Sequence, residues 1–84
     1  MYKITFSKVA DKTLRKMPGN FAIIITKKIK QLAVNPKKMH NVKKLTDHPG
    51  YRLRIGDWRV LYTLNETEMI IHIVSIKTRG EVYK

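Results

Sequence analysis

The residues from Tyr51 to Leu64 constrain the fold more than any other part of the chain. Apolar and polar side chains alternate over Tyr51–Ile55, and the alternation returns from Trp58 onward after the pair Gly56-Asp57. Alternation with a period of two is typical of a strand with one buried face. A Gly-Asp pair between two such runs favours a tight turn, so we predict a β-hairpin here.

The residues before the hairpin show a helical period instead. Ser7 is expected to cap a first helix, with apolar residues at positions 10, 14 and 17 on one face. Pro18-Gly19 ends that helix, and Asn20 is expected to cap a second one. The second helix stops at Asn35-Pro36, because proline cannot continue the hydrogen-bond ladder. We expect its apolar face to consist of Phe21, Ile25, Ile29 and Leu32, with Ile24 beside it.

Two further segments complete the predicted fold. Residues 2–6 alternate as a strand, and residues 69–77 form a long Ile- and Val-rich strand after a turn at 65–68. Residues 36–50 are interpreted as a basic, partly packed loop. The order strand, helix, helix and three strands predicts one α+β domain over residues 1–84. Its antiparallel sheet (β-α-α-β-β-β) carries a two-helix hairpin on one face.

The charge of the chain is strongly one-sided. Eighteen Lys and Arg stand against six Asp and Glu, which gives a formal net charge of +12. A field of this sign favours polyanionic partners, above all nucleic acid, or an acidic protein. The longest apolar run is Phe21–Ile25, far short of a membrane span, and the chain has no cysteine for a disulfide. We therefore expect a soluble cytoplasmic protein with no membrane partner.

Three arginines are expected to share one face of the sheet. Arg52 and Arg54 alternate with the apolar residues of the first hairpin strand, and Arg59 takes the same side on the second. Three guanidiniums this close repel one another unless an anion lies between them, and the chain has few carboxylates to neutralise them. We interpret them as a phosphate-binding cluster. Further RNA-binding candidates, on the second helix, in the basic loop and at the end of the last strand, are Lys27, Lys28, Lys30, Lys37, Lys38, Lys43, Lys44 and Lys77.

Most enzyme chemistries find no support in this sequence. His40, His48 and His72 lack ligand spacing and neighbouring carboxylates, so we expect no metal site, and we expect His72 to be a satisfied, half-buried residue. No glycine-rich phosphate loop, carboxylate pair or nucleophile elbow is present, and we expect no cofactor. RNA cleavage is compatible with the remaining residues. RNA carries its own nucleophile, the 2′-OH, and needs positioning and charge stabilisation above all.

One run of residues resembles a known family. The sequence Tyr51-Arg52-Leu53-Arg54-Ile55-Gly56-Asp57-Trp58-Arg59-Val60-Leu61-Tyr62, with Arg79-Gly80-Glu81-Val82-Tyr83 near the end, is similar to the RelE/ParE superfamily of type II toxins. The resemblance covers essentially the whole chain. It implies a toxin with a cognate antitoxin protein as partner. RelE-like members cut mRNA in the ribosomal A site without a metal, which makes rRNA and mRNA the other expected partners.

The resemblance also implies site residues. The family's two basic residues on the first hairpin strand match Arg52 and Arg54, and its arginine on the next strand matches Arg59. Its arginine after the last strand matches Arg79, with Lys77 as an alternative, and its terminal tyrosine matches Tyr83. These five (Arg52, Arg54, Arg59, Arg79 and Tyr83) are the candidate catalytic residues. The strand pair is lysine in the best-known members and arginine here, which argues against a general-base role for this pair because guanidinium holds its proton.

Two other functions fit the same pattern. ParE-like members of the superfamily inhibit DNA gyrase and are not nucleases, and the hairpin sequence alone does not separate the two activities. An inactive basic RNA-binding protein is a third reading. Arg79, Tyr83 and the high positive charge favour the ribonuclease.

Overall fold

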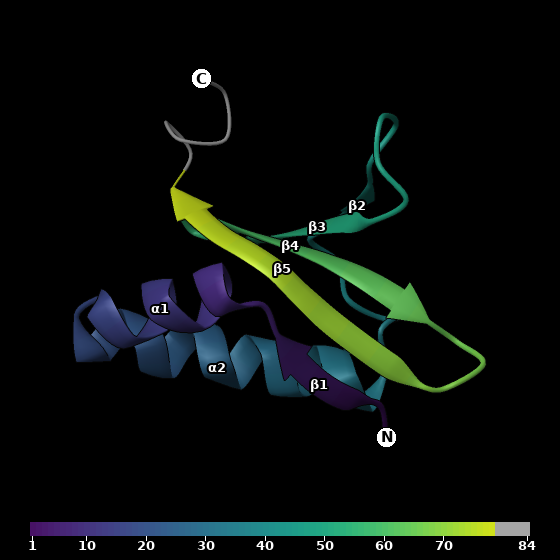
Figure 1. Ribbon diagram of the computed structural model, residues 1–84, viewed down its shortest axis with the longest axis horizontal. Helices are drawn as coiled ribbons and strands as arrows, with labels where there is room; N and C mark the ends of the chain where they lie inside the picture. The colour runs from purple at the N-terminus through teal and green to yellow at the C-terminus, as the bar shows by residue number, and fades with distance from the viewer. Residues whose placement is uncertain (79–84) are drawn as a thin grey trace.

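The computed structural model describes residues 1–78 and contains two layers, a five-stranded sheet and a helical hairpin. In Figure 1 both helices lie against one face of the sheet, and no helix of residues 1–78 covers the other face. The elements are β1 (Lys3–Phe6), α1 (Lys8–Lys16), α2 (Gly19–Val34), β2 (Val42–Lys44), β3 (Tyr51–Ile55), β4 (Trp58–Asn65) and β5 (Ile70–Thr78). The predicted α+β class is confirmed.

The strand order is β1-β5-β4-β3-β2. The β3–β4 hairpin turns at Gly56-Asp57, with Gly56 at φ 59°, as the sequence predicts. Two features differ from expectation. Residues 42–44, interpreted as loop, form the short edge strand β2, and β1 pairs with β5 in parallel.

The helix ends follow from local hydrogen bonds. The Ser7 hydroxyl accepts from the backbone N–H of Ala10 at 3.0 Å and caps α1, and Asn35 follows the last residue of α2. The expected cap at Asn20 is wrong. Pro18 occupies the N-cap position of α2 and Asn20 lies inside the helix, because proline has no backbone N–H to donate and is tolerated where a helix begins.

The core lies between the helices and the inner face of the sheet. Ile25, Ile29 and Leu32 of α2 pack there as predicted, together with alternate residues of β3, β4 and β5. Phe21, expected in this core, is 41% exposed and Ile24 is 48% exposed. Both lie toward the N-terminal end of α2, where they line an open pocket described below instead of the closed core. Within residues 1–78, no helix is long and apolar enough to cross a membrane.

Gly50 marks a close approach of the β2–β3 loop to the sheet. A Cβ atom at this position would lie 2.7 Å from the carbonyl oxygen of Tyr62, a backbone atom that cannot rotate away. We expect Gly50→Ala to destabilise the fold by about 1–3 kcal/mol, because the loop must shift to relieve the overlap. This lowers the melting temperature by about 4–8 °C per kcal/mol in a domain of this size.

Gly19→Ala provides the matched control. A Cβ at Gly19, the first residue of α2, meets nothing within 4 Å, and alanine favours helix. Thermal unfolding followed by circular dichroism should therefore show a large drop in melting temperature for Gly50→Ala and none for Gly19→Ala. Equal melting temperatures for the two variants would contradict the close approach.

Candidate nucleic-acid interface

The open face of the sheet brings together cations from three strands. Arg54 of β3 lies directly opposite Arg59 of β4, and Arg59 lies directly opposite Lys77 of β5. Directly opposed residues have Cβ atoms about 5 Å apart, so the three side chains form one line across the sheet. We call Arg54, Arg59 and Lys77 the cation row. Arg54 and Lys77 are exposed and form no ion pair with any residue in the described part of the chain.

A second line of residues lies beside the cation row. Arg52 of β3 stands opposite Lys43 of β2 on one side and Leu61 of β4 on the other. Leu61 in turn stands opposite Ser75 of β5. The predicted grouping of Arg52, Arg54 and Arg59 on one face therefore agrees with the strand register, and the structure adds Lys43 and Lys77 to it.

Arg59 differs from the other cations because it is buried. Only 6% of it is exposed, and its Nη1 donates hydrogen bonds to the carbonyl oxygens of Gly56 at 3.0 Å and Trp58 at 3.1 Å. Its Nε is buried and has no hydrogen-bond partner among the residues described. A buried donor without a partner is costly unless a ligand supplies one. Arg59 is therefore a cation held in one position, and its Nε can still donate a hydrogen bond to an anion.

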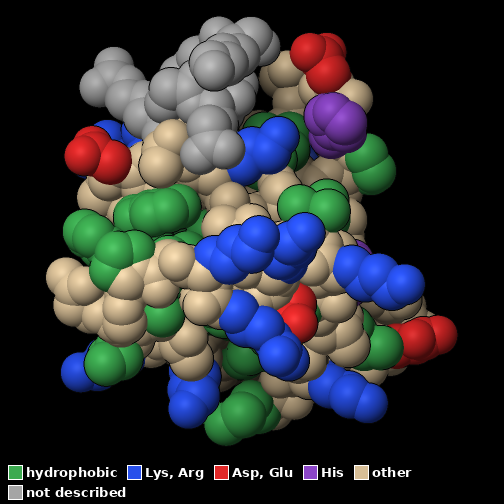
Figure 2. Space-filling view, turned by 60° about the vertical axis from the view of Figure 1, so that its left-hand side comes forward, with side chains coloured by type: hydrophobic (Ala, Val, Ile, Leu, Met, Phe, Trp, Pro, Cys, Tyr) green, Lys and Arg blue, Asp and Glu red, His purple; other side chains and the backbone are tan. Residues whose placement is uncertain are grey.

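The remaining candidate lysines occupy other surfaces. Lys27, Lys28 and Lys30 lie on α2, in the layer on the other side of the sheet from the cation row. In the view of Figure 2, Lys and Arg side chains are spread among hydrophobic ones, with few acidic side chains between them. Lys37 forms an ion pair with Glu66 at 3.2 Å. Lys38 lies exposed in the loop after α2, and Lys44 stands opposite Tyr51 at the edge of the sheet.

Arg79 and Tyr83 lie outside the residues that the structure describes. Their predicted roles stay predictions. In the sequence they follow β5, whose last exposed cation, Lys77, belongs to the cation row.

The histidines are not grouped as metal ligands. His72 is half-buried and its Nδ1 forms a 2.7 Å hydrogen bond with the Thr5 hydroxyl, as expected for a satisfied histidine between two strands. Within the described range, no three His, Asp or Glu side chains gather where they could hold a metal ion.

Tyr62 is the residue whose acid–base chemistry the fold changes most clearly. Its ring is 2% exposed and stacks on Tyr51, with 5.5 Å between ring centroids. Burial, and secondarily the nearby Tyr51 phenol, raises the pKa of Tyr62 to about 12. A phenol that holds its proton this tightly belongs to the core and not to the acid–base chemistry of the open face.

The raised pKa of Tyr62 predicts a specific alkaline instability. Between about pH 10, the pKa of an unfolded tyrosine, and about pH 12, the folded chain keeps a proton that the unfolded chain releases. The free energy of unfolding therefore falls as pH rises through this window, by at most about 1.4 kcal/mol per pH unit. In urea denaturation over the same pH range, the free energy of unfolding of Tyr62→Phe should fall less than that of wild type. An equal fall in the free energy of unfolding of both proteins would contradict a raised pKa at Tyr62.

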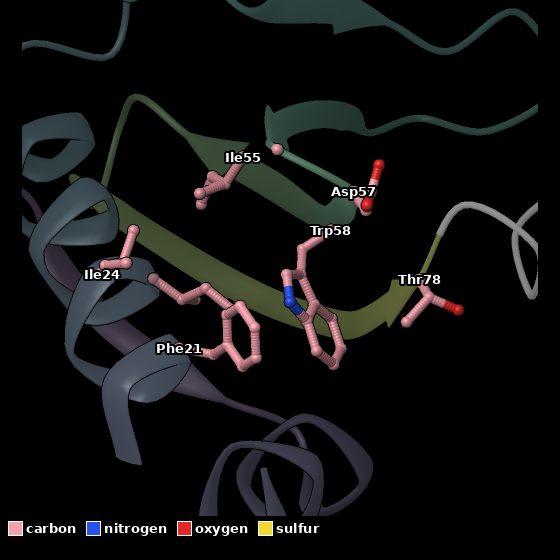
Figure 3. A pocket seen from close by; sticks show the side chains of 8 residues that line it. Phe21, Ile24, Ile55, Asp57, Trp58 and Thr78 are labelled. Atoms are coloured by element: carbon pink, nitrogen blue, oxygen red, sulfur yellow. The ribbon is translucent and has the colours of Figure 1, made fainter. Parts of the chain in front are cut away.

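An apolar pocket lies at the end of the β3–β4 hairpin, next to α2. It has a volume of about 370 Å³ and is lined by residues of α2, the hairpin and the last residue of β5, Thr78. Figure 3 shows the rings of Phe21 and Trp58 side by side at this pocket, and their centroids are 6.2 Å apart. Trp58 also supplies one of the two carbonyls that hold Arg59, so the pocket and the cation row share the β3–β4 turn.

Comparison with known proteins assigns the family. Residues 4–83 match the model of the ParE toxin of type II toxin–antitoxin systems, parDE. The chain belongs to this toxin family. No curated protein sequence matches it.

Solved structures of RelE toxins share the fold. The RelE–RelB complex from Pyrococcus horikoshii OT3 is 28% identical, with a TM-score of 0.80, and the match covers 94% of this chain and 96% of that one. The Methanococcus jannaschii RelB–RelE complex is 25% identical, with a TM-score of 0.75 and 95% of each chain covered. The Escherichia coli RelBE complex is 21% identical, with a TM-score of 0.80, covering 93% of this chain and 96% of that one.

The predicted membership of the RelE/ParE superfamily is thus confirmed. All three of these structures are complexes of a toxin with its antitoxin.

Proposed function

We propose that this toxin is a ribosome-dependent endoribonuclease that cuts mRNA in the A site, in the cytoplasm and without a metal. The observation that carries the proposal is the cation row, with Arg59 fixed by two backbone carbonyls and its Nε left for an anion. A preorganised donor in a water-poor site stabilises charge that develops in a transition state better than a mobile surface cation does.

The reaction uses the RNA's own nucleophile. The 2′-oxygen attacks the neighbouring phosphorus and loses its proton, and the bond from phosphorus to the 5′-oxygen breaks. The 5′-oxygen takes up a proton, which gives a 2′,3′-cyclic phosphate and a 5′-OH. Because two negative charges gather on the phosphorane, cations from two or three strands are suited to stabilise it.

The residues divide into four roles. Arg59 stabilises the phosphorane, and Arg52 and Arg54 bind the adjoining phosphates. Arg79 assists the departure of the 5′-oxygen. Tyr83 stacks on the A-site nucleotide or helps to activate its 2′-OH.

The lysines away from the cation row bind the ribosome. Lys27, Lys28 and Lys30 form an exposed basic stretch on α2. We assign them to rRNA, so that the helical layer holds the ribosome while the open face of the sheet holds mRNA. Lys37, Lys38, Lys43 and Lys44 extend the basic surface around the sheet edge. Contacts of this kind weaken steeply with added salt.

The antitoxin segment that inhibits the toxin is expected to be amphipathic. Acidic side chains of this segment suit the cation row, and its apolar side chains suit the pocket lined by Phe21 and Trp58. The two surfaces lie on either side of the β3–β4 turn. A segment that spans both surfaces covers the mRNA site.

Gyrase inhibition is the second candidate function, and the family model favours it. The model that matches residues 4–83 is described as ParE, and ParE-like toxins are the gyrase inhibitors of the superfamily. In that case the cations serve in protein or DNA binding, and no RNA bond is cut.

Primer extension separates the two. In a purified translation system, we expect discrete cuts inside A-site codons when the toxin is added, and none when ribosomes are omitted. Intact mRNA together with loss of gyrase supercoiling activity would overturn the nuclease proposal in favour of the gyrase one.

A further inference from the structure

A small pocket lies on the open face of the sheet, under the loop that joins β2 and β3. In Figure 1 this loop rises on the side of the sheet away from the helices. The pocket has a volume of about 170 Å³. Its walls come from the loop and from the outer faces of β4 and β5, and the side chains that shape it are Leu45, His48, Pro49, Leu61, Thr63 and Val74.

The pocket adjoins the cations of the proposed RNA site. Leu61, which lines the pocket, is the direct cross-strand neighbour of Arg52. Leu61 is also two residues along β4 from Arg59, a separation of about 7 Å at the rise of an antiparallel strand. When a phosphate of the RNA lies on the cation row, a base next to that phosphate can therefore reach this pocket.

The pocket is held in a fixed shape by two features of the backbone. The pairing of β4 with β5 shifts register after Leu61, so that Val74 is an extra residue in β5 and its side chain stands 41% exposed. The Ser7 hydroxyl donates a 2.6 Å hydrogen bond to the Val74 carbonyl. Bulges of this kind re-aim side chains beside functional sites.

The loop side of the pocket is equally constrained. The backbone N–H of Leu45 donates to the carbonyl of Gly50 at 3.0 Å, which closes the loop. Gly50 packs so tightly on Tyr62 that no side chain fits between them. A site formed before its ligand arrives loses less entropy on binding.

The size and lining of the pocket suit one aromatic ring. An apolar protein cavity on the order of 150 Å³ binds benzene. Leu45, Leu61 and Val74 supply apolar surface for the faces of a ring, and two further lining residues, His48 and Thr63, have side chains that can form hydrogen bonds. A six-membered pyrimidine ring, close to benzene in size, fits within this volume.

We propose that this pocket binds a pyrimidine base of the RNA strand whose phosphate lies on the cation row, and so sets a base preference for cleavage. The proposal depends on the proposed nuclease function for the presence of mRNA on this face. It adds a recognition site for the base to a site otherwise built for phosphate.

A binding experiment tests the pocket without requiring cleavage. Cytidine 3′-monophosphate, titrated into the ¹⁵N-labelled full-length chain, should shift the amide NMR signals of Leu61, Thr63 and Val74. Adenosine 3′-monophosphate should shift signals of the cation row and bind at least 5-fold more weakly. Equal affinity for the two nucleotides, or shifts confined to the cation row for both, would overturn the proposal.

Two substitutions at the exposed Val74 change the pocket in opposite directions. Val74→Phe fills it and should weaken binding of the cytidine nucleotide at least 10-fold. Val74→Ala enlarges it and should reduce the preference for cytidine over adenosine. Val9→Phe, at a valine on α1 that is 61% exposed, is the matched control and should bind as wild type does. An unchanged preference for cytidine over adenosine nucleotide in both Val74 variants would refute the proposed role of the pocket.

Sequencing of the cut ends on ribosomes separates this proposal from the nuclease proposal. We expect wild type to favour a pyrimidine at one fixed position relative to the cut, and Val74→Ala to relax that preference. Cleavage with no base preference overturns the proposed role of the pocket and leaves the nuclease proposal standing. Pyrimidine binding in the pocket without any cleavage overturns the nuclease proposal and leaves the pocket as a base-binding site.

Discussion

Replacing Arg59 with glutamine should lower the rate of mRNA cleavage about 100- to 1,000-fold. This is the usual cost of removing one preorganised donor from a site that stabilises transition-state charge. Arg59 is the one cation of the row that is buried, and its Nη1 is held by the carbonyls of Gly56 and Trp58. Glutamine stays polar but lacks the charge and the reach of Nη1, so the melting temperature of the variant shows whether the turn survives the change.

The measurement is the single-turnover rate of cutting on ribosomes at saturating toxin, with the melting temperature recorded for each variant. Arg15→Gln is the matched control. Arg15 is an exposed arginine on α1 that pairs with Asp11 at 3.0 Å, and such surface pairs contribute little to stability. A folded Arg59→Gln protein that cuts within about 3-fold of wild type would remove Arg59 from the mechanism.

The hairpin was predictable because its information is local. Alternation over Tyr51–Ile55, the turn at Gly56-Asp57 and the return from Trp58 each follow from neighbouring residues, and the register agrees. The cap at Ser7 is local in the same way. The proposed grouping of three arginines followed directly, since strand alternation decides which side chains share a face.

The strand β2 was not predictable on the same grounds. It has three residues, two of them lysine, and its pairing depends on β3, which lies later in the chain. The parallel pairing of β1 with β5 joins the two ends of the described chain, so no local pattern encodes it. Long-range pairing decided both features.

The bulge beside the pocket under the β2–β3 loop has a trace in the sequence. Buried isoleucines alternate at Ile71 and Ile73, and the next one is Ile76, three residues on. That change of phase indicates the bulge at Val74. The burial of Arg59, by contrast, depends on carbonyl groups of the turn, which residue types do not reveal.

The exposure of Phe21 corrects the sequence analysis in an informative way. Helical spacing alone grouped Phe21 with Ile25 and Ile29, yet only the two isoleucines are buried. Phe21 lies two residues after the first residue of α2, beside Trp58 at the tip of the hairpin. The core ends there, so the same helical stripe continues into an open apolar surface suited to a protein partner.

Replacing Tyr83 with phenylalanine should lower cleavage by about 10²- to 10⁴-fold, the usual size of a lost acid–base group. Arg79→Ala should have a loss of similar size, because Arg79 is proposed to assist the leaving 5′-oxygen. Tyr2→Phe is the matched control for the loss of a phenol hydroxyl, and it should cut as wild type does. The measurement is again the single-turnover rate on ribosomes.

A third variant, Tyr83→Ala, distinguishes the two roles proposed for this tyrosine. If the ring only stacks on the A-site nucleotide, phenylalanine retains activity and alanine loses it. If the hydroxyl takes part in activating the 2′-OH, phenylalanine and alanine lose activity alike. Cleavage unchanged in Tyr83→Ala and Arg79→Ala together would exclude both residues from catalysis. In that case Lys77, already in line with Arg59 and Arg54, is the remaining basic group that can serve the leaving oxygen.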